Sequence, residues 1–85
     1  MKHIITYDLC KPGQNYSLLA NEITSIGQCI KINQSCWVVK SNLTAIQIRN
    51  RLTQFTDRND SLIIIPFNFY AACGLDAFVY AWLNT

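Results

Sequence analysis

Residues 28–40, QCIKINQSCWVVK, decide the fold class of this chain. They contain two short runs rich in β-branched and apolar residues, 28–32 and 35–40, separated by Asn33-Gln34, and this pattern predicts a β-hairpin. If Ile32 lies opposite Ser35, side chains alternate between two faces of the hairpin. On that register, Ile30, Ile32, Trp37 and Val39 form the face expected to lie under helices, and Cys29, Lys31, Cys36, Val38 and Lys40 form the other.

A helical pattern flanks the hairpin on each side. Before it, apolar residues from Tyr16 onward recur at helical spacing and stop at Gly27, which predicts a helix over about 15–26. After it, Thr44-x-x-Gln47 is a capping-box pattern that predicts a helix over about 44–55.

A strand pattern lies beyond each of these helices. HIITYD at 3–8 predicts the first strand and SLIIIPF at 61–67 the last, with Pro66 restricting the last strand to a sheet edge or to its own end. Residues 75–83 predict a short additional helix, with Asp76 near its start.

The resulting order, β-α-β-β-α-β plus a C-terminal helix, predicts one α+β domain over 1–85 of the ferredoxin-like type, with a four-stranded antiparallel sheet. Two helices cover one face of such a sheet. The other face would carry Val38, alternate residues of the first strand and half of the last strand, and it is apolar enough to favour a homodimer.

The low content of charged residues also favours a surface for association with a second copy. The 85 residues are 51% hydrophobic but only 14% charged, with a net charge of +2 that does not indicate nucleic-acid binding by itself. No long apolar run or leader pattern is present, which predicts a cytoplasmic protein without a membrane partner. Four cysteines without CxxC spacing and a single histidine argue against a zinc site.

Asp8 is the carboxylate that stands out, because it ends a hydrophobic strand directly after Tyr7. An aspartate at this place commonly hydrogen-bonds the following loop, and the alternative is a functional carboxylate. Asp57 and Asp60 fall in a polar turn, where aspartate is common. Lys11 follows the Asp8 strand and can reach a phosphate nearby.

Four segments in order resemble the stand-alone proteins of the Cas-two-like family, the small CRISPR-associated ferredoxin-fold proteins related to virulence-associated protein D. The segments are Tyr7-Asp8, Lys11-Pro12-Gly13-x-x-Tyr16, Ser35-Cys36-Trp37 and Asn59-Asp60-Ser61-Leu62. The resemblance covers about residues 3–67.

The resemblance implies a homodimer in which Asp8 meets its symmetry mate and holds Mg²⁺ or Mn²⁺ for phosphodiester cleavage. Tyr7, Lys11, Arg49 and Arg51 are the candidate contacts to RNA or DNA, although Arg49 and Arg51 are two residues apart and cannot share one helix face.

Three functions therefore remain open. The first is a metal-dependent endonuclease, acting on RNA, with Asp8 as the catalytic metal ligand. The second is a non-catalytic dimer that binds nucleic acid or a nucleotide. The third is a dimeric adaptor or antagonist of a protein partner.

Overall fold

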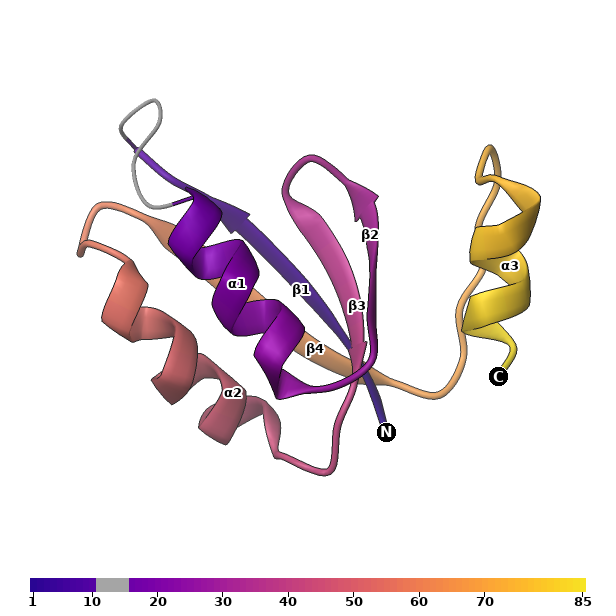
Figure 1. Cartoon of the computed structure of the whole chain (residues 1–85), viewed down its shortest axis with the longest axis horizontal. Helices are drawn as coiled ribbons and strands as arrows, with labels where there is room; N and C mark the ends of the chain where they lie inside the picture. Colours follow the sequence, from indigo (N-terminus) through magenta and orange to yellow (C-terminus); the bar gives the residue numbers. More distant parts are fainter. Residues whose placement is uncertain (11–15) are drawn as a thin grey trace.

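A computed structural model describes residues 1–10 and 16–85. The elements follow in the predicted order: β1 Lys2–Asp8, α1 Tyr16–Ile26, β2 Cys29–Asn33, β3 Cys36–Lys40, α2 Ala45–Leu52, the 3₁₀ turn η1 Thr53–Phe55, β4 Ser61–Phe67 and α3 Ala77–Leu83. The four strands form one antiparallel sheet in the order β2-β3-β1-β4. The ferredoxin-like prediction is confirmed (Figure 1).

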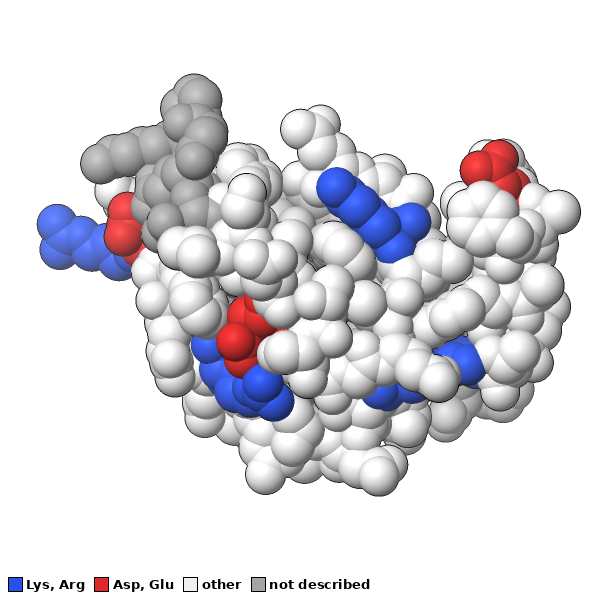
Figure 2. All heavy atoms as spheres, in the orientation of Figure 1, with Lys and Arg blue, Asp and Glu red and all other residues white. Residues whose placement is uncertain are grey.

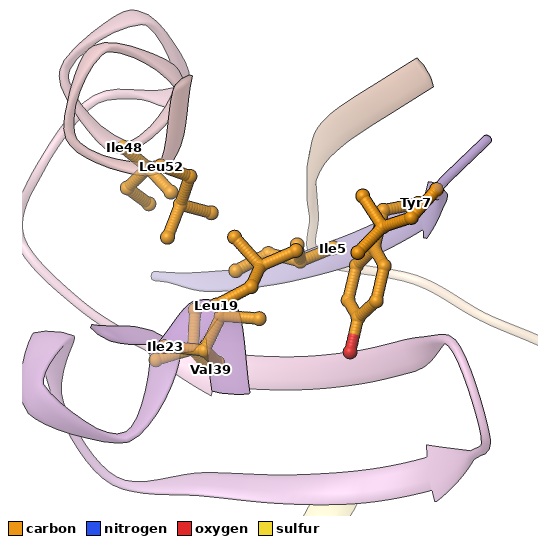
Figure 3. Close-up of a cluster of buried hydrophobic side chains, with 8 residues drawn as sticks. Ile5, Tyr7, Leu19, Ile23, Val39, Ile48 and Leu52 are labelled. Carbon is orange, nitrogen blue, oxygen red and sulfur yellow. The ribbon is translucent and has the colours of Figure 1, made fainter. Parts of the chain in front are cut away.

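α1 and α2 lie next to each other on one face of the sheet (Figure 1). The main core fills the space between these helices and strands β1 and β3, and Figure 3 shows its side chains pointing toward one another. Its buried members are Ile5, Tyr7, Leu9, Leu19, Ile23, Val39, Ile48 and Leu52.

The predicted capping box fixes the start of α2. The Thr44 side chain accepts a hydrogen bond from the Gln47 amide, and the Gln47 side chain accepts one from the Thr44 amide. Two helix-end donors are satisfied in this way. The helix is shorter than predicted, because residues after Leu52 tighten into η1.

The predicted hairpin forms, but its register was wrong by one residue. Ile30 pairs with Val38, and an irregularity lies between Lys31 and Asn33. Because neighbouring residues of a strand point to opposite faces, this shift moves Ile30 and Ile32 away from the helices. Trp37 remains on the helix side, as predicted.

α3 packs against the face of the sheet opposite α1 and α2. A second cluster there contains Val38, Val79 and Leu83 as buried residues, together with the partly buried Ile4, Ile30, Ile32, Phe67, Leu75 and Trp82. The face expected to be bare is therefore covered over β2 and β3 by the chain's own tail. No helix in residues 1–10 and 16–85 has the length and apolarity needed to cross a bilayer.

Candidate functional site

Asp8 is the last residue of β1 and its side chain is exposed. Within β1, His3, Ile5 and Tyr7 are buried, and Ile5 and Tyr7 belong to the main core under the helices, whereas Ile4 packs in the cluster under α3. Because side chains alternate along a strand, Thr6 and Asp8 point to the same face as Ile4. Asp8 therefore lies on the face of the sheet opposite α1 and α2, which α3 covers only in part.

An uncovered apolar strip lies next to Asp8 on this face. It consists of Ile63 and Ile65 of β4, which are 53% and 48% exposed. Ile65 pairs with Ile4, Ile63 pairs with Thr6, and the next pair in the same direction is Ser61 with Asp8. The β4 strip and Asp8 thus form one continuous surface that α3 leaves open.

The backbone around Asp8 is held mainly from the β4 side. Pairing of β1 with β3 ends at Thr6 and Cys36, followed by one bond in which the Tyr7 amide donates to the Ser35 carbonyl at 3.1 Å. Pairing with β4 continues through Asp8.

Asp60 continues this support beyond the end of β1. The Cys10 amide donates to its Oδ1 at 2.7 Å, and the Asp57 amide donates to its Oδ2 at 2.7 Å. Asp60 was predicted to lie in a polar turn and was given no role at the site. The available signal was its position directly before β4, within the Asn59-Asp60-Ser61-Leu62 segment.

Tyr7 is placed in the core rather than at a nucleic-acid surface. It is 5% exposed, and its hydroxyl accepts a hydrogen bond from Trp37 Nε1 at 3.1 Å. Its ring centroid lies 6.0 Å from that of Tyr16 (Figure 3 shows Tyr7 at one end of the main core). This packing leaves little of the ring accessible for stacking on a base.

The two arginines of α2 do not gather around Asp8. Arg51 Nη2 lies 2.7 Å from Glu22 Oε2, and its Nε donates to the same oxygen at 2.9 Å. Arg49 is exposed and bonds Asn50 Oδ1 at 3.1 Å. Both belong to a helix on the opposite face of the sheet from Asp8. Lys11 lies outside the described residues.

Charged side chains are scattered on the face drawn in Figure 2, where the lysines and arginines of the described residues occur in separate groups. Two lysines contact tryptophan rings: Lys31 Nζ lies 5.7 Å from the Trp37 ring centroid and Lys40 Nζ lies 4.5 Å from that of Trp82. These cation–π contacts hold the cations against the hairpin and the tail.

The described residues contain no group of three or more His, Cys, Asp or Glu side chains arranged to hold a metal ion. Within one chain, Asp8 would therefore be a single carboxylate ligand. Burial raises the pKa of the Cys29 and Cys36 thiols, which favours the neutral form and suits their packing against the sheet.

His3 is a buried polar residue at the opposite end of β1. Neither ring nitrogen makes a hydrogen bond within the described residues. Burial lowers the pKa of His3, as does the N-terminal ammonium group, while the nearby backbone of Leu43 and Ser41 acts in the opposite direction. The neutral ring is therefore favoured in the folded protein.

Comparison with known proteins identifies solved structures of similar fold. No model of a protein family matches the sequence, and no curated protein matches it. Cas2 of Streptococcus pyogenes superposes with a TM-score of 0.63 at 24% identity, over 80% of this chain and 87% of that one. A hypothetical protein from Thermus thermophilus superposes with a TM-score of 0.69 at 21% identity, over 87% of this chain and 90% of that one. The chain has the fold of Cas2, as the resemblance to the Cas-two-like family predicted.

Proposed function

We propose that this protein, which has the Cas2 fold, is a homodimeric metal-dependent endonuclease that cleaves RNA, with Asp8 of each copy as the catalytic metal ligand. One observation carries the proposal: Asp8 is an exposed carboxylate at the end of β1, directly beside the uncovered β4 strip. If the two-fold axis of the dimer passes beside Asp8, a second copy that covers the strip brings its own Asp8 to the same place.

The apolar side chains that α3 leaves exposed support the dimer. Ile63 and Ile65 are adjacent on one face, and a fully buried isoleucine contributes about 1.5–3 kcal/mol relative to an exposed one. The low charge content, 14%, leaves few solvated side chains to separate two copies. A face-to-face dimer would use the β4 half of the sheet, because α3 occupies the β2–β3 half.

Paired carboxylates at a dimer axis suit a hard divalent ion. Two carboxylates about 4 Å apart repel by roughly 4 kcal/mol at an effective dielectric constant of about 20, so a cation between them is favoured. Mg²⁺ commonly takes one or two carboxylates and completes its coordination with water. The two Asp8 side chains would provide this donor set, and the ion would supply a Lewis acid for phosphodiester hydrolysis.

Cationic groups at the same end would meet the phosphate backbone. Arg58 is exposed and belongs to the turn that Asp60 joins to Cys10, so it lies at the Asp8 end of the sheet. Lys11 follows the same strand in the sequence. The position of Arg58 favours a phosphate contact, and Lys11 stays a candidate from its place in the sequence alone, whereas Arg51 is engaged by Glu22.

The test is cleavage of a labelled single-stranded RNA, with DNA of the same sequence alongside, in Mg²⁺, Mn²⁺ or EDTA. We expect metal-dependent cleavage that Asp8→Asn abolishes without changing the dimer mass measured by light scattering. Asp76→Asn is the matched control, because Asp76 is an exposed carboxylate whose side chain makes no capping bond.

Other outcomes assign the protein to one of the alternatives. RNA binding that weakens steeply with salt and survives Asp8→Asn would favour a non-catalytic nucleic-acid module. Absence of both cleavage and binding, with co-purification of another protein, would favour an adaptor. A one-chain mass at micromolar concentration would refute the shared Asp8 site.

A further inference from the structure

The Asp60 carboxylate joins two segments of backbone. One of its oxygens accepts from the Cys10 amide, two residues after β1, and the other accepts from the Asp57 amide in its own turn, both at 2.7 Å. The Asp60 amide in turn donates to the Asp57 carbonyl at 3.0 Å. Hydrogen bonds to a charged acceptor are shorter and stronger than those between neutral groups. The turn is therefore a closed unit tied to the exit of β1.

Within residues 1–10 and 16–85, few other contacts support the exit of β1. Beyond Tyr7 no pairing with β3 continues, and pairing with β4 ends at Asp8 and Ser61. The side chain of Leu9 is buried in the main core. Among the described residues, the segment beyond Tyr7 is thus fixed by the β4 ladder, the Leu9 side chain and the Asp60 carboxylate.

We propose that Asp60 is a positioning residue for Asp8, holding the end of β1 in the direction that presents the Asp8 carboxylate to the second copy and its metal ion. This inference rests on the proposed function. Leu9 faces the main core and Asp8 faces the opposite side, so a small rotation of the backbone between them would turn the carboxylate away from the axis. The bond from Cys10 to Asp60 restricts that rotation.

A metal site depends on such outer contacts. Loss of the groups that orient a metal ligand typically weakens metal affinity or activity by about 10–100-fold, even when the ligand itself is intact. In a symmetric dimer the same loss would occur in both copies. Asp60 bonds the backbone near Asp8 and not the Asp8 side chain, so we expect the low end of this range, about 10-fold, when its bonds to the Cys10 and Asp57 amides are removed.

The experiment measures Mn²⁺ affinity of the full-length dimer by electron paramagnetic resonance, with amide exchange at Cys10 as a second readout. Asp60→Ala removes the acceptors of the Cys10 and Asp57 amides. Asp60→Asn retains one acceptor oxygen and keeps the size of the side chain. Asn59→Ala changes the same turn at an exposed residue, and Asp76→Asn removes one negative charge elsewhere.

The expected order of Mn²⁺ affinity is wild type, then Asp60→Asn, then Asp60→Ala, with both controls equal to wild type. The Cys10 amide should exchange faster in Asp60→Ala while circular dichroism and dimer mass stay unchanged. Excess Mn²⁺ should restore cleavage to Asp60→Ala but not to Asp8→Asn, a difference that a general loss of stability would not produce.

The experiment distinguishes a failure of the positioning role from a failure of the proposed function. If Asp8→Asn abolishes Mn²⁺ binding but Asp60→Ala binds as tightly as wild type, the positioning role is refuted and the proposed function stands. If wild type binds no Mn²⁺, or Asp8→Asn binds it normally, the proposed metal site is refuted and the role of Asp60 with it. If Asp60→Ala does not fold, Asp60→Asn decides, and unchanged affinity in that variant overturns the proposal.

Discussion

Replacing Leu83 with alanine is expected to release α3 from the sheet while the core under α1 and α2 stays intact. Leu83 is 5% exposed and packs in the second cluster with Val38 and Val79. α3 has seven residues, too few to be helical in water without tertiary contacts. Its helix therefore depends on this docking.

The magnitude follows from how Leu83 is packed. A buried leucine replaced by alanine typically costs about 2–5 kcal/mol. Leu83 also borders an apolar hollow of about 130 Å³, so part of its surface touches no protein atom. We expect the low end, about 2–3 kcal/mol. Phe78→Ala is the matched control: Phe78 is 65% exposed, and alanine is the better helix former by about 0.5 kcal/mol.

Hydrogen exchange measured by mass spectrometry separates the two parts of the fold. Leu83→Ala should accelerate exchange of the α3 amides by roughly 30–150-fold, the equivalent of 2–3 kcal/mol, and leave the amides of α1 unchanged. In Phe78→Ala the α3 amides should exchange no faster than in wild type. Equal acceleration in α1 and α3 would show that the tail and main core open together and would refute the reasoning.

Three further predictions concern stability. Gly27→Ala would place a Cβ atom in steric overlap with the Lys40 carbonyl oxygen, so we expect the free energy of unfolding to fall by about 1–3 kcal/mol. The thermal midpoint should drop by roughly 4–8 °C per kcal/mol, and an unchanged midpoint would contradict this. Because the pKa of His3 is lowered in the folded protein, the unfolded chain binds a proton at a higher pH than the folded chain does. The urea midpoint should therefore be highest above pH 6.5 and fall as the pH drops below that value. His3→Phe should reduce this pH dependence, and an identical dependence in the variant would exclude His3 as its source. Thr44→Ala removes the capping bond to the Gln47 amide and should cost about 1 kcal/mol in urea unfolding, whereas an unchanged midpoint would mean that the cap is not needed.

The order of elements could be predicted from the sequence because local signals agree with the fold. Helical spacing stops at Gly27, the Thr44 capping box begins α2, and Pro66 falls on an edge strand. The hairpin register could not be predicted. It depends on an irregularity between Lys31 and Asn33 that no characteristic residue type marks in the sequence. The irregularity places Ile30 on the face opposite to the predicted one.

The candidate site was predicted in part. The position of Asp8 at a strand end follows from the pattern of β1, and its exposure follows from strand alternation. The burial of Tyr7 and the pairing of Arg51 with Glu22 depend on contacts 29 or 30 residues apart in the sequence, which no local pattern encodes. Docking of α3 likewise depends on tertiary packing. Whether Asp8, Lys11 or Arg49 contacts a ligand stays a prediction.

The position of β4 at the sheet edge bears on how the protein avoids misassembly. Residues 61–65 of β4 form a short run of high β-propensity without charge, and their outer backbone has no neighbouring strand in the described sheet. Such segments can template fibrils. Pro66, which has no amide hydrogen to offer an incoming strand, interrupts the run at its end and acts as a gatekeeper. In the proposed dimer, a second copy over Ile63 and Ile65 would also make the run less accessible to amyloid-like stacking.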